Sequence, residues 1–163
     1  MSDYYLARVQ SSLSLAQAEK IVDGALAAGR AAGLLPLAVA VLDAGGNLAA
    51  FKREDGCGVL RFDIAFGKAW GALGMGISSR TIRDRLANRP AFQSALAAAS
   101  DGRFVAVPGG VLALDAAGQA IGAVGVSGDA SDRDEYAAIM GVRAAGLASH
   151  PGEPAENWQS AGL

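Results

Sequence analysis

The chain has 163 residues, which is enough for one domain with a substantial core. Its formal net charge is −2, and Arg80, Arg83, Arg85 and Arg89 are interrupted by Asp84, so we interpret them as a solvated helix face and exclude a nucleic-acid partner. A single cysteine, Cys57, excludes an intramolecular disulfide and a CxxC metal or redox motif.

The hydropathy of the chain predicts a protein without a membrane partner. No apolar run reaches membrane-spanning length and the N-terminus lacks a signal-peptide core, so we expect a cytoplasmic location. Hydrophobic residues make up 52% of the chain, and it has 22 glycines. Small residues leave flat apolar surface that another subunit can cover, which favours a homo-oligomer, although an ordinary alanine-rich composition explains the same numbers equally well.

The first element of the predicted domain is a helix that follows an N-terminal arm, residues 1–12. Ser14 and Gln17 have the spacing of a capping box, with Ser14 as the N-cap. Apolar residues then recur at helical spacing until Gly33, which is a good C-cap. The apolar stripe is narrow, so we expect this helix to lie on a sheet.

Two similar hairpins are expected on either side of the chain's middle. Residues 40–51 read AVLDAGGNLAAF, and residues 112–123 read LALDAAGQAIGA. Each has an apolar run, a Leu-Asp-Ala step, a glycine-bearing turn and a return strand. We therefore expect both hairpins in one antiparallel sheet.

Helices fill most of the chain between the hairpins. We predict helices over 61–73, 79–86 and 90–100, and a further strand over Phe104–Val107. Lys68 falls on or beside the apolar stripe of the first of these helices. It either snorkels to the surface or points its ammonium into a pocket.

The second half of the chain compresses a strand, a glycine loop and a helix start into a short stretch. The strand 121–126 ends at Ser127-Gly128, and Ser131 is the expected N-cap of a last helix, 132–148. Backbone N–H groups at such a junction can hold an anion.

Residues 149–163 are expected to form a tail, which leaves 13–148 as the domain. The fold class is therefore α+β, a single domain with a central antiparallel sheet of about five strands flanked by helices.

The order of landmarks resembles the GlcG/HbpS-like family, which also includes the C-terminal domain of PduO-type proteins. The similarity covers about residues 13–147 and rests on these stretches: AVLDAGGNLAAFKREDG, DIAFGKA, FVAVPGG and IGAVGVSG followed by DE. The resemblance implies a profilin-like fold, assembly into tetramers or octamers, and haem binding in some members. No histidine lies in the matched region, so haem is a candidate cofactor for this chain and not an assigned one.

The resemblance also marks candidate site residues. The expected ligand-binding set is Arg53, Asp55, Lys68, Gly109, Gly110 and Glu135. Two cations can hold a carboxylate, and a nearby carboxyl can act as a general base if its pKa is raised, which makes Lys68 and Glu135 the catalytic candidates. Surface or inter-subunit salt bridges are the alternative interpretation of the same charges.

The candidate donors for a metal or haem iron are few. One histidine and one cysteine make a zinc site improbable, so no metal site is expected. A haem iron needs one axial donor, and the candidates are Cys57, Met75, Tyr136 and His150. His150 is expected to be a solvent-exposed residue of the tail.

Three functions remain open from the sequence. The first is a small-molecule-binding oligomer that acts as a carrier or sensor, with haem or another tetrapyrrole as candidate ligand. The second is a small cofactor-independent enzyme that acts on an organic acid or a catabolic-pathway intermediate through a Lys/Arg/carboxylate pocket. The third is a structural accessory subunit, for which no pocket is expected near Lys68 and Glu135.

Overall fold

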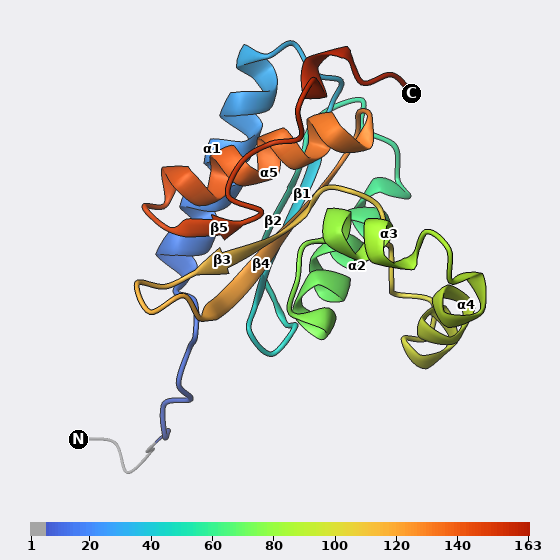
Figure 1. Ribbon diagram of the computed structural model, residues 1–163. Coiled ribbons are helices and arrows are strands. Elements are labelled where there is room, and N and C mark those ends of the chain that lie inside the picture. Colours follow the sequence, from blue (N-terminus) through green and yellow to red (C-terminus); the bar gives the residue numbers. More distant parts are fainter. Residues whose placement is uncertain (1–5) are drawn as a thin grey trace.

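Within the described residues, five strands form one antiparallel sheet whose spatial order, β2-β1-β4-β3-β5, differs from their order in the chain. The computed structural model describes residues 6–163, and Figure 1 shows the strands crossing the centre of the molecule. The strands are β1 (Ala38–Asp43), β2 (Leu48–Arg53), β3 (Gly110–Leu114), β4 (Ala120–Ser127) and β5 (Ala148–His150). The predicted fold class, a single α+β domain with a five-stranded antiparallel sheet, is confirmed.

The two predicted hairpins are confirmed, and their turns are built in the same way. β1 pairs with β2, and β3 pairs with β4. Oδ1 of Asp43 accepts hydrogen bonds from the backbone N–H groups of Gly45 and Asn47, and Oδ1 of Asp115 accepts them from residues 117 and 119. An aspartate that satisfies its own turn in this way explains why the same short pattern recurs.

The helices cover both faces of the sheet, as Figure 1 shows. Their bounds are α1 (Leu15–Ala31), α2 (Arg61–Met75), α3 (Ser79–Leu86), α4 (Pro90–Ala99) and α5 (Ser131–Ala144). α1 and α5 pack together on one face, while α2 lies on the other with α3 beside it. α4 projects from the body, and none of its residues is buried. No helix in the described part of the chain is long and apolar enough to cross a membrane.

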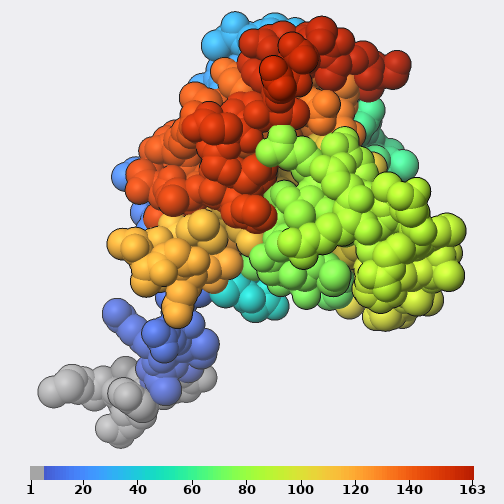
Figure 2. All heavy atoms as spheres, in the orientation of Figure 1, coloured from blue at the N-terminus to red at the C-terminus, as the bar shows by residue number. Residues whose placement is uncertain are grey.

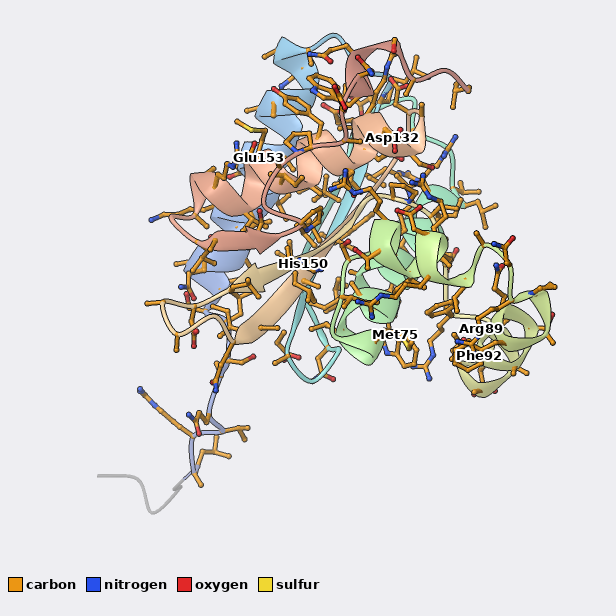
Figure 3. All side chains as sticks on the ribbon, in the orientation of Figure 1. Met75, Arg89, Phe92, Asp132, His150 and Glu153 are labelled. Carbon is orange, nitrogen blue, oxygen red and sulfur yellow. The ribbon has the colours of Figure 1, made fainter. Side chains whose placement is uncertain are left out.

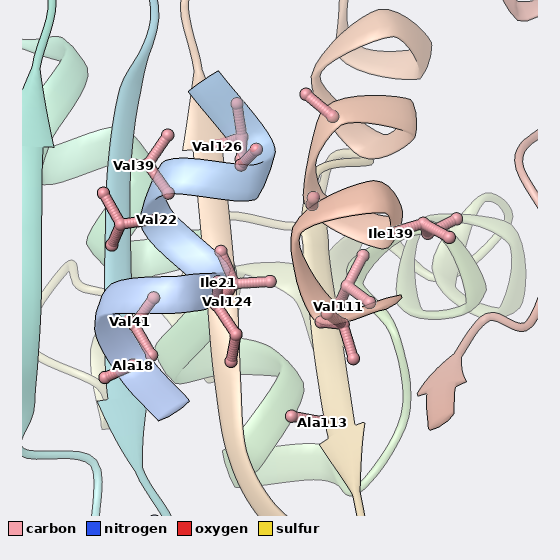
Figure 4. Packing of buried hydrophobic residues seen from close by; sticks show 14 of the residues in the cluster. Ala18, Ile21, Val22, Val39, Val41, Val111, Ala113, Val124, Val126 and Ile139 are labelled. Atoms are coloured by element: carbon pink, nitrogen blue, oxygen red, sulfur yellow. The ribbon is translucent and has the colours of Figure 1, made fainter. Parts of the chain in front are cut away.

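The main core lies between the sheet and the α1–α5 pair (Figure 4). Alternate residues of the strands, such as Val124 and Val126, point into this core and meet Ile21 of α1. The predicted capping box of α1 is present, with the N–H of Gln17 donating to Oγ of Ser14 at 3.1 Å. The narrow stripe expected from the sequence is therefore enough to fix α1 on the sheet.

Helix α2 approaches the other face of the sheet unusually closely because glycine faces it. A Cβ atom on Gly125 of β4 would lie 1.8 Å from the carbonyl oxygen of Ala65. Only glycine fits such a contact between two backbones. This close approach brings the middle of α2, including Lys68, against the end of β4.

The predicted strand Phe104–Val107 is wrong, because these residues form no strand. They cross α2 instead, where the N–H of Val105 donates to the carbonyl of Gly67. A Cβ on Gly67 would lie 2.2 Å from the carbonyl oxygen of Arg103, so glycine in α2 makes room for this crossing. The fifth strand is β5, which pairs with β3 through Leu112 and His150.

The two ends of the domain differ in detail from the prediction. Ser131 is the first residue of α5 and not its cap, which is Ala130, and the helix ends at Ala144, before Gly146 with its φ of +74°. In the predicted arm, residues 6–12 have no helix or strand, and residues 1–5 lie outside the described residues. The segment after β5, predicted as a tail, runs back across α5 to a short 3-10 helix, Trp158–Ser160.

Candidate functional site

Lys68 is a fully buried cation on α2. It is 1% exposed, and its Nζ lies 3.0 Å from Oδ2 of Asp134 and 2.9 Å from the carbonyl oxygen of Val126. The other carboxylate oxygen of Asp134 accepts a hydrogen bond from the N–H of Asp129 at 2.9 Å. Lys68 therefore does not snorkel: its ammonium is held inside the protein between β4 and the first turn of α5.

Burial changes the acid–base properties of both members of this pair. Desolvation lowers the pKa of Lys68, although the negative charge of Asp134 opposes the shift. Desolvation likewise raises the pKa of Asp134, against the opposing charge of Lys68 and the hydrogen bond from Asp129. Burial therefore weakens the preference of each group for its charged form, while the attraction between the two charges opposes that effect.

A second ion pair lies next to the first. Nη1 of Arg80, on α3, is 3.3 Å from Oε1 of Glu135, which is fully buried. Burial raises the pKa of Glu135 to about 7, against the lowering effect of Arg80. Such a carboxyl is half protonated near neutral pH and has the acid–base strength of a general acid or base.

The glycine bend before β3 fits between these groups. A Cβ on Gly109, where φ is +121°, would lie 2.9 Å from Nζ of Lys68. A Cβ on Gly110 would lie 2.2 Å from the carbonyl oxygen of Lys68, and the N–H of Gly110 donates to Oγ of Ser79 at 2.7 Å. The double glycine thus lets the chain pass directly over the lysine, and it ties β3 to the start of α3.

The structure brings together only part of the predicted ligand-binding set. Lys68, Gly109, Gly110 and Glu135 lie at one end of the sheet, between α2, α3 and α5. Arg53 pairs with Ala38 of β1, which pairs in turn with Ser127 of β4. Arg53 is therefore two strands, or about 10 Å, away from the end of β4.

Arg53 and Asp55 line a separate surface groove of about 540 Å³. Its other lining residues are Arg30, Leu34, Pro36 and Glu54. Glu54 pairs with Arg30 at 3.0 Å and accepts a hydrogen bond from the N–H of Leu37 at 2.8 Å. The groove therefore carries equal numbers of acidic and basic side chains, so it has no preference for an anion.

The four candidate axial donors have very different positions. Met75 ends α2, is 38% exposed and lines a cavity. His150 lies on β5, and its Nε2 atom is buried without a hydrogen-bond partner in the described part of the chain. His150 is thus not the exposed tail residue expected from the sequence. Tyr136 is stacked on Trp158 at 3.7 Å. Cys57 is half-buried, and burial raises the pKa of its thiol against the charge of Arg61.

The cavity beside Met75 is mainly apolar. It has a volume of about 150 Å³, and its lining includes Trp70, Phe104 and Leu96 of α4. A second cavity of about 160 Å³ lies on the other side of Trp70, against the first hairpin turn. Lys68 and Glu135 line neither of them. Figure 3 labels Met75 on the side of α2 that faces α4, and we call the two cavities around Trp70 the Trp70 slot.

Sequence reasoning missed Asp134 and Arg80 as members of the buried cluster. The sequence marked Asp134 only as the first residue of the acidic pair, DE, in the family resemblance, and Arg80 only as part of a solvated helix face. The side chain of Arg80 is 21% exposed and reaches Glu135. The continuous apolar run of β4, whose residues 122–127 are all buried, was the sequence signal that could have indicated helices on both faces of this strand.

Residues 13–143 match the model of a family described as haem degrading protein HbpS-like. No curated protein sequence matches the chain. Among the described residues, 6–163, no three His, Cys, Asp or Glu side chains are grouped so that they could hold a metal ion.

Several solved structures share the fold. A PduOC–haem complex superposes with a TM-score of 0.75 at 23% identity, over 85% of this chain and 98% of that chain. The ORFY protein of Klebsiella pneumoniae gives 0.74 at 24% identity, over 89% and 98%. A double mutant of Streptomyces reticuli HbpS gives 0.69 at 28% identity, over 85% and 89%. The expected profilin-like arrangement agrees with these neighbours.

Proposed function

Because this chain belongs to the HbpS-like family of haem-degrading proteins, we propose that it binds haem or a related tetrapyrrole as a small-molecule carrier or sensor. The observation that carries the proposal is the Trp70 slot, where aromatic walls and the thioether of Met75 meet. Ligand sites are mostly apolar with a few polar groups that fix orientation. The structural neighbour solved as a haem complex supports the same ligand class.

The residues around the slot fit the chemistry of haem. Trp70 and Phe104 offer flat apolar surface, and the sulfur of Met75 is a donor that haem iron accepts. The guanidinium of Arg103 lies 4.4 Å from the Trp70 ring centre, where it can pair with a carboxylate of the ligand. When bound, haem supplies the redox and gas-binding chemistry of its iron.

The slot on one chain is too small to enclose a tetrapyrrole. Each of its two cavities is about 150 to 160 Å³, whereas enclosed ligand sites usually measure roughly 300 to 1,000 Å³. We therefore propose that the protein is a homo-oligomer, a tetramer or octamer, and that a second copy completes the site. Sedimentation velocity with and without haemin tests the proposed oligomer, and a monomer in both conditions would contradict it.

The cytoplasmic location stays a prediction.

A haemin titration followed by absorbance tests the proposed ligand. We expect a saturable Soret band at one haem per subunit, weakened and shifted in Met75→Leu. Met140→Leu is the matched control, because Met140 lies on α5, away from the slot, and its sulfur faces Arg143. Lys68→Ala and His150→Ala are measured alongside to test the other candidate regions. Non-saturating binding that is equal in all variants would contradict the proposal.

A second candidate function is favoured by the buried charges. The chain would be a cofactor-independent enzyme that acts on an organic acid or a catabolic-pathway intermediate, with Lys68 and Glu135 as the catalytic candidates. Two groups with pKa values shifted toward neutrality lie together at one end of the sheet, and Arg80 lies beside them. Such shifts gather at functional sites, although structural ion pairs produce them too.

Turnover of small carboxylic acids, measured with wild type and Glu135→Gln, tests the enzyme function. The substitution removes the titrating group and keeps the size of the side chain, so activity should fall at least 100-fold if Glu135 transfers the proton. Glu156→Gln is the matched control because Glu156 is exposed. The absence of turnover for every acid, or equal rates in both proteins, would contradict this candidate.

A further inference from the structure

The segment that follows β5 covers the buried carboxyl of Glu135. We call residues 151–156 the C-terminal strap; Figure 2 shows the chain's red C-terminal end lying over α5 and next to the green residues of α3. The N–H of Ala155 faces the Glu135 carboxyl and acts to lower its pKa, although the contact is not a well-aligned hydrogen bond; desolvation by burial is the larger effect and raises that pKa. Nη2 of Arg143, on α5, donates to the carbonyl of Gly152 at 2.6 Å. The strap is therefore held against the helix that carries Glu135.

One guanidinium group connects the strap to that carboxyl. Nη1 of Arg80 lies 3.3 Å from Oε1 of Glu135, while Nη2 donates to the backbone carbonyl of Glu153 at 3.1 Å. Figure 3 shows Glu153 in the segment that leaves His150. A change in the charge of Glu135 is therefore felt by a group that also anchors the strap.

The surroundings of Glu135 suit the neutral acid better than the carboxylate. Its side chain is fully buried, and among residues 6–163 neither of its oxygens has a hydrogen-bond partner of good geometry. The charged groups around it are Arg80 and Arg83 from α3, Asp132 from its own helix and Lys68 from α2. His150 lies on β5, the strand that leads into the strap. Burial makes the ionised carboxylate costly, and the charge of Arg80 at 3.3 Å offsets only part of that cost, because the pKa of Glu135 remains raised.

We propose that the C-terminal strap is a proton-controlled cover, closed while Glu135 is neutral and released when Glu135 ionises. Ionisation acts in two ways that both loosen the strap. The carboxylate needs water, which reaches it only if the strap moves, and it attracts both arms of Arg80, which then leaves the carbonyl of Glu153. The strap stays attached to α5 through Arg143, so release opens one side of the strap rather than unfolding the domain.

The raised pKa of Glu135, about 7, puts this switch near neutral pH. If the carboxyl regains its ordinary pKa when the strap opens, linkage requires the opening equilibrium to increase about tenfold between pH 6 and pH 8. The opening equilibrium continues to decrease as the pH falls below 6, toward pH 4.5, and it no longer changes above about pH 8.

Hydrogen exchange of the full-length chain measures this opening. The exchange rate of the Ala155 amide, which faces the buried Glu135 carboxyl, is corrected for the intrinsic effect of pH and compared between pH 6 and pH 8. We expect an approximately tenfold loss of protection in wild type and no pH response in Glu135→Gln, which stays closed. Glu156→Gln, the exposed neighbour in the strap, should keep the wild-type response.

Two further variants separate the proposal from its alternatives. Histidine ordinarily changes charge between about pH 5 and 8, so His150→Asn must leave the pH response intact if Glu135 controls the strap. Arg80→Lys removes the shared anchor and should leave the strap weakly protected at both pH values, even if Glu135→Gln fails to fold. A pH response that persists in Glu135→Gln, or one that disappears in His150→Asn, would overturn the proposal.

Discussion

Nζ of Lys68 lies 3.0 Å from Oδ2 of Asp134, and this buried pair joins α2 on one face of the sheet to the first turn of α5 on the other. The contact passes the end of β4, where the carbonyl of Val126 accepts the second hydrogen bond of the lysine. The pair thus connects the two layers of helices at one point. Its integrity should matter for stability whichever ligand the protein binds.

Removing one partner of this pair should be strongly destabilising. Lys68→Met or Asp134→Asn leaves a buried group without its partner, which costs about 3 to 5 kcal/mol. The double variant should lose clearly less than the sum, because it leaves no uncompensated charge. Urea unfolding of the four proteins measures this coupling. If the two losses are additive, the ion pair is not the source of the effect.

The free energy of unfolding should depend on pH through Glu135. Its pKa is about 7 in the folded protein against an ordinary value of 4.5, so the folded state binds the extra proton. Stability is therefore lost as pH rises from about 4.5 to about 7, by up to about 3 kcal/mol, and then levels off. Denaturant unfolding of wild type and Glu135→Gln at each pH isolates this contribution. If the difference in free energy of unfolding between the two proteins stays constant over this range, Glu135 titrates normally and the prediction fails.

The close approach of α2 to the sheet should make Gly125 sensitive to a single methyl group. In Gly125→Ala the new Cβ meets the backbone of α2, so we expect a loss of about 1 to 3 kcal/mol. Gly74→Ala is the comparison, because its Cβ would meet only the Trp70 ring, at 3.9 Å. This second change should be neutral or stabilise α2 by up to about 1 kcal/mol. Thermal unfolding of both variants tests the contrast, which fails if the two lose equally.

The capping box of α1 should make a modest and local contribution. Ser14→Ala removes the acceptor for the N–H of Gln17 and should lower the free energy of unfolding by about 1 kcal/mol. Ser11→Ala, in the exposed segment before the helix, is the matched control and should change it little. Chemical denaturation of the two variants gives the comparison. Equal effects would mean that α1 is held by packing alone.

The hairpins and the first helix were predictable because their signals are local. Asp43 and Asp115 each accept hydrogen bonds from backbone N–H groups within the same turn, so the sequence pattern contains the whole interaction. Ser14 and Gln17 form their capping box within one helical turn. Such contacts need no information about the rest of the molecule, and an interpretation from the sequence can identify them.

The site was only partly predictable because its contacts are long-range. The sequence singled out Lys68, Glu135 and the double glycine, yet it also added Arg53, which the sheet order puts two strands away. The interpretation from the sequence placed Arg80 in solvent. A helix exposed to solvent and a helix whose arginine contacts a buried carboxyl on another helix have the same pattern of charges, so the sequence does not distinguish them. The strand Phe104–Val107 failed for the same kind of reason, since glycines in α2 let these residues cross the helix instead.

Most helices and both hairpin turns followed from the sequence alone, because capping groups, turn residues and apolar periodicity act over a few residues. Which charges meet depends instead on how the elements pack. Lys68 and Asp134 are separated by 66 positions, and their pKa values shift because both lose water when α2 and α5 close over the end of β4. Desolvation depends on every element that excludes water, so no short stretch of the sequence contains it.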